Sequence, residues 1–483
     1  MLIKHFFIGK IAHSSYLLVG ENRCAVIDPQ RDVDIYIAEA RAMGVDITHI
    51  LQTHLHADFI SGHMDLARRT GAEIYVAKSA ECKFDHVGLS EGDSVELEDV
   101  VLEVLETPGH TPEHLSSVVI DRSRSDSPIG VFVGDTLFVG DVGRPDLFPD
   151  MAEELAGKLF HSLHDKLLKL PDYVEVYPAH GAGSLCGRAV GAKWRTTIGY
   201  ERNFNSALQI KDEPAFIKSL TTNMPPAPDH FSRCSEINRE GPILVADLPN
   251  MEELKPGQFK ERLSDANTAV LDTRGYHAFA SQQIADSWHL DLNGNFPTFA
   301  GWVLPTDKDI VLVADDHERA LETNTWARRV GVDRITGYLD GGMVAWAVAG
   351  FRTGHTEIIS AEDLHNMITG AADFVLLDVR ARLEYKDSHI KGAINIPVAE
   401  LRTRHRELDK DRTTVVVCSS GNRSSLGASI LKQHGFHNVS NVAGGLSGYS
   451  AAGYIRECRV CVNPHGSRFF TSFGKVNEHW DAV

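Results

Sequence analysis

The sequence has few cysteines, fewer basic than acidic residues, and no long hydrophobic run. Its 483 residues include only 7 Cys, an odd number that favours a reducing cytosol over a disulfide-linked fold. No apolar run approaches the roughly 20 residues that span a bilayer. The first residues form neither an apolar signal stretch nor an Arg/Ser-rich transit pattern. The 48 Lys+Arg against 66 Asp+Glu give a net charge of −18, which disfavours nucleic acid and anionic membranes as partners. We therefore predict a cytoplasmic protein that binds neither.

The length and the hydrophobic pattern predict several mixed α/β domains. A chain of 483 residues is too long for one core, and about three domains are expected. Residues 1–240 alternate strand-like runs with helical patterns, up to a Pro-rich break at 223–228. The expected strands are Ser15–Val19, Cys24–Ile27, Thr48–Leu51, Glu73–Val76, Val101–Leu105, Leu115–Ile120, Gly130–Phe138 and Val174–Tyr177, and the expected helices include Val33–Met43 and Ala152–Lys169.

The second half of the chain contains an internal repeat. Leu271-Asp272-Thr273-Arg274 aligns with Leu377-Asp378-Val379-Arg380, and Asp340-Gly341-Gly342 aligns with Ala443-Gly444-Gly445. We predict two copies of one α/β domain, at 258–355 and 358–455, each built from parallel strand–helix units. Residues 456–483 are then a C-terminal tail.

Histidines and aspartates follow several predicted strands of the first domain. His54, His56 and Asp58 form an HxHxD run after the strand that ends at Leu51. Three later strands are followed by segments that deliver His110, Asp135 and His180. One histidine at a strand end is usually structural, but four such segments predict a metal site at one edge of the scaffold.

These motifs, THxHxD, TPGHT, GD and PAHG, resemble those of the metallo-β-lactamase fold. In the dinuclear hydrolases of that fold a histidine follows the aspartate of the first motif, whereas this chain has Phe59. The missing imidazole argues for one metal instead of two. Two histidines and a carboxylate with open positions suit non-haem Fe(II) and O₂, and within this fold the motifs look like those of persulfide dioxygenases. That resemblance implies one mononuclear Fe(II) per chain, held by His54, His110 and Asp135, with His56, Asp58 and His180 nearby.

Several alternatives remain open in this domain. A zinc thioester hydrolase of the glyoxalase II type would use His56 as a ligand, but it needs two metals, and Phe59 counts against it. Arg144 resembles a residue that could hold the carboxylate of a thiol cofactor, or it could fix a turn by pairing with Asp146. Cys186 is either a redox thiol or a small buried hydrophobic residue.

The third domain contains a cysteine at the end of a strand, followed by a polar loop and a helical run. Backbone N–H groups of such a loop can surround the sulfur of Cys418 and stabilise a thiolate or persulfide anion. A buried structural cysteine would not need this loop. The predicted catalytic residues are Cys418 and Arg423, and the loop residues are Ser419, Ser420, Gly421, Asn422 and Ser424.

This loop resembles that of the rhodanese sulfurtransferases, and the resemblance covers nearly all of 358–455. In the preceding copy the position of the cysteine is occupied by Ala314, and the loop up to Arg319 has no glycine and three acidic residues. That copy is predicted to be inactive and to serve as a spacer or docking surface.

The predicted fold is multidomain α+β and α/β, with a metallo-β-lactamase αββα sandwich followed by two rhodanese-like domains. The predicted function is oxidation of small-molecule persulfides by O₂ to sulfite, coupled to sulfur transfer through Cys418 that makes or uses thiosulfate. Such an enzyme would detoxify sulfide, and we expect it to be a homo-oligomer. A persulfide carrier or sensor, with the first domain as a scaffold, is the alternative outside the enzymes.

Overall fold

The computed structural model describes residues 1–188, 190–222, 224, 227–454 and 457–458. It divides into two units, residues 1–248 with 325–331, and residues 249–324 with 332 onward. The predicted tail therefore lies outside the described residues, except for 457–458. No helix of the described residues is long and apolar enough to cross a membrane.

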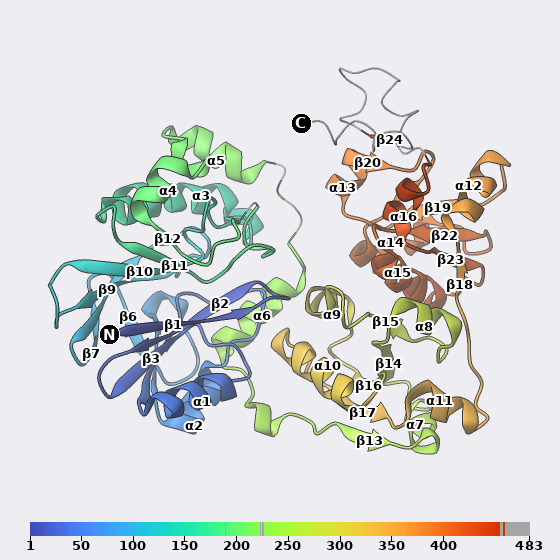
Figure 1. Cartoon of the computed structure of the whole chain (residues 1–483), viewed down its shortest axis with the longest axis horizontal. Coiled ribbons are helices and arrows are strands. Elements are labelled where there is room, and N and C mark those ends of the chain that lie inside the picture. The colour runs from blue at the N-terminus through green and yellow to red at the C-terminus, as the bar shows by residue number, and fades with distance from the viewer. Residues whose placement is uncertain (189, 223, 225–226, 455–456, 459–483) are drawn as a thin grey trace, which may run out of the picture. The chain divides into compact units, whose positions relative to one another are not determined.

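The first unit contains two six-stranded sheets (Figure 1), and they share one core. That core joins Tyr16 and Leu18 of one sheet to Leu102 and Phe132 of the other. The first sheet runs in the order β1 (Leu2–Ile8), β2 (His13–Val19), β3 (Arg23–Ile27), β4 (Asp46–Leu51), β5 (Glu73–Ala77) and β6 (Val87–Leu89). The second runs β12 (Thr196–Thr197), β11 (Glu175–Pro178), β10 (Pro128–Gly134), β9 (Leu115–Asp121), β8 (Val100–Glu106) and β7 (Ser94–Leu97).

Helices cover the outer face of each sheet, which completes the predicted αββα sandwich. Tyr36 and Leu66 pack against the first sheet, and Leu159 and Phe216 against the second. The α-helices are α1 (Asp34–Met43), α2 (His63–Thr70), α3 (Ala152–His161), α4 (Ile198–Phe204), α5 (Glu213–Thr221) and α6 (His230–Glu240). The shorter turns are η1 (Lys78–Ala80), η2 (Pro149–Met151), the π-helical η3 (Ser162–Lys166), η4 (Leu167–Lys169), η5 (Ala207–Gln209) and η6 (Val245–Asp247).

Most predicted elements of this unit agree with the observed ones to within two residues, but two differ by more. The strand expected to reach Phe138 ends at Gly134, whose φ of +48° turns the chain out of the sheet. A side chain at Gly134 would collide with His114, so only glycine fits there. The expected helix 152–169 is α-helical only to His161, then π and 3₁₀, and it ends just before Pro171.

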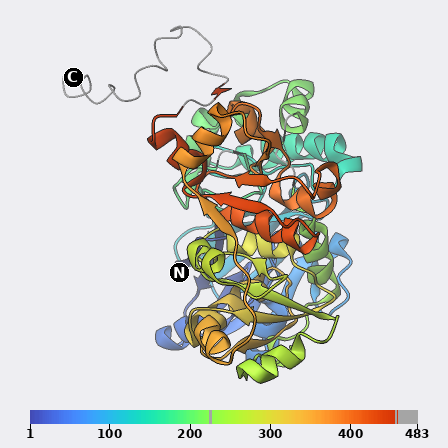
Figure 2. The same cartoon turned by 90° about the vertical axis from the view of Figure 1, so that its right-hand side faces the viewer.

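The second unit contains two five-stranded sheets with the same topology, which confirms the internal repeat as tandem copies of one fold. All strand pairs within each sheet are parallel. The first sheet runs β13 (Glu252–Leu254), β17 (Ile335–Leu339), β16 (Asp309–Val313), β14 (Thr268–Asp272) and β15 (Trp288–His289). The second runs β18 (Glu357–Ile359), β23 (Val439–Val442), β22 (Thr414–Val417), β19 (Val375–Asp378) and β21 (Ile394–Asn395). The strands of the second sheet, orange to red, lie side by side in Figure 2.

Each copy alternates its strands with helices. The first copy has α7 (Pro256–Arg262), α8 (Tyr276–Ser281), α9 (Phe296–Val303), α10 (His317–Arg329) and α11 (Gly342–Val348). The second has α12 (Ala361–Thr369), α13 (Arg382–Asp387), η7 (Val398–Glu400), α14 (Leu401–Arg404), η8 (His405–Glu407), α15 (Asn422–Gln433) and α16 (Gly445–Ala451). A two-stranded pair, β20 (Ser388–His389) with β24 (Glu457–Cys458), lies beside the second copy. The exact domain boundaries stay a prediction.

Candidate functional site

The first unit brings three of the predicted residues together in its interior. His54 follows β4, His110 follows β8 and Asp135 follows β10, and all three are at most 1% exposed. Their potential ligand atoms lie within 4.8 Å of one another. His110 Nε2 is 3.3 Å and His54 Nε2 is 3.8 Å from Asp135 Oδ2. Two imidazoles and one carboxylate thus converge as they would around one cation.

The outer nitrogens of the two imidazoles are held by the loops, which aims the inner ones at Asp135. His110 Nδ1 donates to the carbonyl oxygen of Arg144 at 2.9 Å, and His54 Nδ1 lies 2.9 Å from Thr53 Oγ1. Within the described part of the chain, neither Nε2 atom has a hydrogen-bond partner. Burying a polar atom without a hydrogen-bond partner costs free energy. Hydrogen bonds at the other ring nitrogen, like those at the two Nδ1 atoms here, orient histidines that ligate a metal. These residues fit a bound metal ion.

The electrostatics of the three groups also suit a cation. Burial lowers the pKa of both His54 and His110, which keeps the imidazoles neutral and able to ligate. Burial alone would raise the pKa of Asp135, but the neighbouring His180, His110 and His54 hold it well below its usual range. The first unit therefore has a metal-binding site of His and Asp side chains.

The other predicted residues of this domain surround the three. His180 lies between two carboxylates, with Nδ1 2.7 Å from Asp135 Oδ1 and Nε2 3.0 Å from Asp58 Oδ2. Although burial opposes its charge, these carboxylates raise the pKa of His180 well above its usual value. His56 Nε2 lies 3.1 Å from Asp28 Oδ1 instead of joining the first group. This placement is compatible with the predicted near-metal role of His56, which stays a prediction.

Phe59 and Cys186 are both buried beside residues of this site. Phe59 is fully buried, and its ring centroid lies 4.4 Å from that of His56. Cys186 is also fully buried, and its sulfur falls within 4.8 Å of ligand atoms of Asp58 and His180. Burial raises the pKa of the Cys186 thiol well above its usual value. An inert thiol in apolar packing with Ala57 and Phe138 fits these facts better than a redox role.

Sequence reasoning missed two residues that support the metal site. His114 Nε2 accepts a hydrogen bond from the backbone N–H of Asp135 at 2.9 Å, and burial lowers its pKa to about 3. Asp28 accepts hydrogen bonds from the N–H and hydroxyl groups of Thr53, at 2.7 and 2.8 Å. His114 could have been found from its position four residues after His110. Asp28 has no motif around it.

Arg144 is buried and fixes a turn. Its guanidinium donates to both carboxylate oxygens of Asp146, at 2.7 and 2.8 Å, and to the carbonyl oxygen of Leu185. These contacts agree with the turn alternative, and a role of Arg144 in substrate binding stays a prediction. The carbonyl oxygen of the same residue holds His110, so the turn also orients a predicted metal ligand.

A cavity of about 380 Å³ opens beside the residues that flank the metal site. Leu55 and Ala57 flank His56 on one wall, and Thr111 follows His110 on another. Further lining residues are Leu147, Phe148, Phe231, Glu81, Glu113, Glu236 and Arg239. The volume suits a small organic molecule with apolar and polar parts.

In the second unit, Cys418 lies in a loop that surrounds its sulfur with donors. The residue follows β22 and is 1% exposed. The backbone N–H of Gly421 donates to Sγ at 3.1 Å, and the hydroxyl of Ser424 donates at 3.2 Å. Gly421 has a φ of +106° and is the N-cap of α15, so the loop turns back toward the sulfur at a helix N-terminus. This arrangement stabilises an anionic sulfur.

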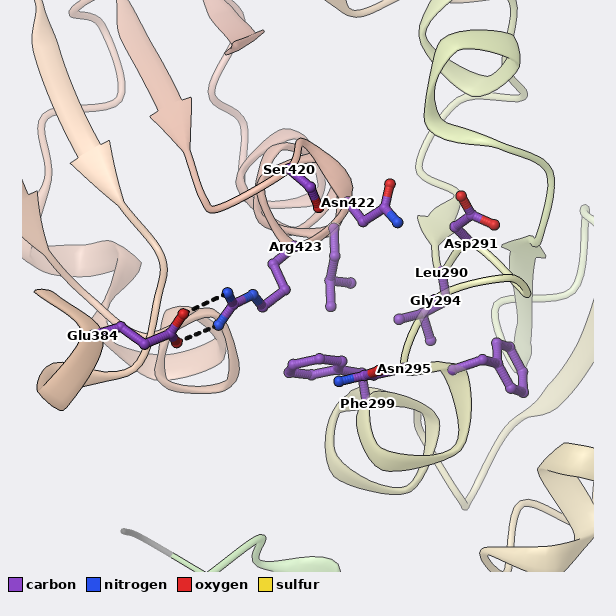
Figure 3. Close-up of a pocket in the computed structure, with 11 residues that line it drawn as sticks. Leu290, Asp291, Gly294, Asn295, Phe299, Glu384, Ser420, Asn422 and Arg423 are labelled. Carbon is purple, nitrogen blue, oxygen red and sulfur yellow. Dashed lines mark hydrogen bonds and ion pairs between the residues drawn. The ribbon is translucent and has the colours of Figure 1, made fainter. Parts of the chain in front are cut away.

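The remaining predicted loop residues lie around this nest. Arg423 donates to the two carboxylate oxygens of Glu384, at 2.6 and 2.8 Å, and to the hydroxyl of Ser419 at 2.9 Å. Ser420 and Asn422 line a neighbouring cavity (Figure 3). The charge of Arg423 is therefore balanced by Glu384, a partner that sequence reasoning did not assign.

The first copy keeps the framework of the second but has no cysteine loop. Asp272 and Arg274 form a buried ion pair at 2.6 Å, as Asp378 and Arg380 do in the second copy. At the end of β16, however, Ala314 takes the place of the cysteine, and the Asp316 carboxylate accepts a hydrogen bond from the N–H of Arg319. The first copy thus has the Asp316 carboxylate in the loop where the second copy has hydrogen-bond donors around Cys418.

Comparisons with known proteins agree with this architecture. A family model described as the metallo-β-lactamase superfamily matches residues 8–180, and one described as a rhodanese-like domain matches 255–349 and 360–452. The chain is 31% identical over 240 residues to a mitochondrial persulfide dioxygenase of Mus musculus, covering 48% of this chain and 85% of that protein. It is also 31% identical over 236 residues to a hydroxyacylglutathione hydrolase of Hyphomonas neptunium, and the match covers 48% of this chain and 82% of that protein.

A solved structure extends the likeness beyond the first domain. A metallo-β-lactamase from Staphylococcus aureus aligns with a TM-score of 0.63 and 32% identity, and covers 70% of this chain and 98% of that one. The fold expected from the motifs is confirmed.

Proposed function

We propose that this chain, which belongs to the metallo-β-lactamase superfamily and carries a tandem pair of rhodanese-like domains, is a persulfide dioxygenase joined to a sulfurtransferase. The observation that carries the proposal is the buried group of His54, His110 and Asp135, with Phe59 where a second metal's ligand would be. Two imidazoles and one carboxylate are the ligand set of mononuclear Fe(II) oxygenases. The persulfide dioxygenase among the relatives supports the same assignment.

The residues of the first unit would bind and orient the substrate. Fe(II), when bound to His54, His110 and Asp135, supplies the activation of O₂ that side chains cannot provide. The cavity lined by Leu55 and Thr111 would receive the organic part of the persulfide. The overall reaction balances as RSS⁻ + O₂ + H₂O giving RSH, SO₃²⁻ and H⁺. The buried carboxylate–imidazole chain from Asp135 through His180 to Asp58 would hold the ligands in place.

The second unit would use the sulfite. Cys418 thiolate attacks the outer sulfur of a persulfide, the S–S bond breaks, and the thiol leaves as RSH after taking a proton. The Cys418 persulfide then transfers its outer sulfur to sulfite, which gives thiosulfate and regenerates the thiolate. The Gly421 N–H and the Ser424 hydroxyl, which lie 3.1 and 3.2 Å from Cys418 Sγ, would stabilise the anionic sulfur. Linking both centres in one chain raises the local concentration of sulfite near Cys418.

Oxygen consumption and metal content test the proposal. Protein loaded with Fe(II) is expected to bind one iron per chain and to consume O₂ when a glutathione-type persulfide is added, forming sulfite or thiosulfate. A zinc-loaded sample should be inactive. An iron-loaded protein that takes up no oxygen would rule out the dioxygenase, and loss of O₂ uptake in His110→Ala separates it from a pure persulfide carrier.

A two-metal thioester hydrolase is the second candidate. It is favoured by the hydrolase relatives and by the second group of potential ligands, Asp58, His180 and Cys186. The buried Phe59 side chain beside His56 counts against it. Two zinc ions per chain with cleavage of a glutathione thioester would establish this candidate in place of the dioxygenase.

We also propose a cellular location and an oligomeric state for this enzyme. Low-molecular-weight persulfide oxidation to sulfite and thiosulfate removes sulfide, which suits a cytoplasmic detoxification role. We propose a homo-oligomer, with mass measurement in solution as the test.

A further inference from the structure

The first unit includes a short segment that lies much further along the chain than the rest of it. Residues 325–331, which end α10 and form the turn after it, belong to this unit together with residues 1–248. Val330 in this segment is 1% exposed, and its carbonyl oxygen accepts a hydrogen bond from Arg233 of α6 at 3.3 Å. This supporting segment (residues 325–331) is therefore part of the fold that carries the metal site.

The supporting segment contacts the loop that contains the first metal-site motif. Ile60 of that loop is fully buried, and its backbone N–H donates to the carbonyl oxygen of Arg329 at 2.7 Å. A buried backbone N–H needs such a partner. Trp326 packs against the apolar cluster that contains Phe59. Since Asp58 directly precedes Phe59 and Ile60, the supporting segment restrains the backbone that determines where the Asp58 carboxylate lies.

Side chains of the loop after β3 fix the supporting segment in turn. The guanidinium of Arg329 donates to both carboxylate oxygens of Asp32, at 2.6 and 2.7 Å, and lies 4.2 Å from the centroid of the Trp326 ring. Arg31 is 2% exposed and donates to the carbonyl oxygen of Arg328 at 2.5 Å. A cation at the C-terminal carbonyls of a helix is favourable, and a two-point arginine–carboxylate pair defines geometry as well as energy.

The metal-site loop is held from α6 as well. Asn238 is 1% exposed, and its Nδ2 donates to the carbonyl oxygens of His56 and Phe59 at 2.8 and 2.9 Å. Its Oδ1 accepts a hydrogen bond from the N–H of Ser61 at 2.9 Å. Both donors and the acceptor of this amide are thus used on one loop. Two segments distant in sequence, α6 and the supporting segment, therefore set the backbone of residues 56–61.

A chain of contacts leads from this loop to a predicted metal ligand. Asp58 Oδ2 lies 3.0 Å from His180 Nε2, and His180 Nδ1 lies 2.7 Å from Asp135 Oδ1. A displacement of the backbone at Asp58 would move His180 and would change the orientation of the Asp135 carboxylate. Loss of a direct partner of a metal ligand usually costs about 10–100-fold in metal affinity. The supporting segment acts one contact further out, so a smaller cost is expected from its loss.

We propose that the supporting segment positions the metal ligands of the first unit, with Trp326 and Arg329 as positioning residues that act through residues 58–61. The helix α10 starts in the copy that lacks the cysteine, so this copy contributes a segment to the first unit. That contribution gives the copy a task that needs no nucleophile. The inference concerns metal binding and holds whichever reaction the metal supports.

The test measures the metal affinity of the full-length protein. The apo protein is titrated with Co(II) against a competing chelator, because Co(II) binds N and O ligands like Fe(II) and its absorption bands report the ligand geometry. Trp326→Ala and Arg329→Ala are each expected to weaken Co(II) binding about fivefold, less than the loss of a direct partner would, and to shift the bands. Trp326→Phe, which keeps an aromatic ring in the cluster, should bind Co(II) like the wild type.

A milder variant and a matched control keep the result interpretable. Arg329→Lys keeps the charge but loses the two-point geometry, so it should weaken Co(II) binding less than Arg329→Ala and tests the pair if that variant fails to fold. Arg334→Ala is the control, because Arg334 forms a comparable ion pair with Asp309 at 2.7 Å in the second unit. It should leave Co(II) affinity and bands unchanged.

Two results would overturn the inference. One is wild-type Co(II) affinity and bands in both alanine variants of the supporting segment. The other is an equal loss of affinity in Arg334→Ala, which would assign the effect to general destabilisation. An iron-loaded wild type that consumes no O₂ would reject only the proposed dioxygenase and would leave the role of the supporting segment in metal binding intact.

Discussion

The two candidate centres differ in how the polar atoms at their middle are satisfied. In the first unit the inner nitrogens of His54 and His110 are buried without a hydrogen-bond partner within the described chain. In the second unit the sulfur of Cys418 already receives hydrogen bonds from Gly421 and Ser424. The first centre is complete only with a cation, whereas the second is complete with the chain's own donors.

The two centres therefore depend on different parts of the structure around them. A metal site made of three buried side chains, each at the end of a different strand, binds its metal much more weakly when any one ligand is removed. A backbone nest depends on loop conformation, with Gly421 at a φ that other residues rarely adopt. The two centres should therefore fail separately, and four changes test this expectation.

The largest effect is expected from Cys418→Ser. Sulfur transfer should fall to background, by as much as about 10⁶-fold, because the nucleophile is lost. Oxygen uptake with persulfide should continue, and sulfite should accumulate in place of thiosulfate. Ala314→Cys in the other copy is the matched variant, and it should not restore transfer because its loop has carboxylates where the nest of donors would be. Transfer that survives in Cys418→Ser would place the chemistry on another thiol.

Asp135→Ala should abolish the activity of the first unit alone. Loss of a direct ligand is expected to lower iron affinity more than about 100-fold, the upper end of what loss of an outer partner costs. Oxygen uptake should disappear while thiosulfate-dependent transfer at Cys418 is retained. Asp126→Ala, which removes an exposed carboxylate of the same domain, is the control for iron content. If Asp135→Ala binds iron like the wild type, this carboxylate is not a ligand.

Metal removal should destabilise one unit and spare the other. A ligand present at 100 times its Kd stabilises a fold by about 2.7 kcal/mol, so chelation should lower the stability of the first unit by about that amount. Hydrogen exchange would show faster opening in the segments around His54, His110 and Asp135. Equal loosening of the Cys418 loop would contradict the independence of the two centres.

Ser424→Ala should have the smallest effect. Removing one hydrogen bond to the anionic sulfur costs roughly 1.5–3 kcal/mol, so alkylation of Cys418 at neutral pH should slow at least about tenfold. Ser425→Ala, on the neighbouring buried serine of the same helix, is the control. Equal rates for both variants and the wild type would show that the hydroxyl of Ser424 does not stabilise the thiolate.

The residues of these sites that lie in contiguous motifs could be predicted from the sequence. The motif that begins at Thr53 and the loop after β22 lie in contiguous segments, so their residue types and their strand ends could be predicted together. The strand lengths were predicted less well, since the end of β10 at Gly134 is set by the close approach of His114, from another strand end.

Contacts between distant segments were not predictable from motifs. The pairing of Arg423 with Glu384 and the support of Thr53 by Asp28 each join residues that are far apart in the chain. Their formation depends on the packed fold, and no local pattern marks Asp28 or Glu384 as partners. The hydrogen bond from Ile60 to Arg329 has the same origin, because these two residues meet only after the chain has folded.

The stoichiometry of oxygen uptake by iron-loaded Cys418→Ser protein tests the dioxygenase assignment of the first unit. With the transfer step removed, we expect one O₂ to be consumed for each sulfite formed from glutathione persulfide, and no uptake after iron is removed. Oxygen uptake that is absent in the iron-loaded protein, or unchanged after iron removal, would contradict this assignment.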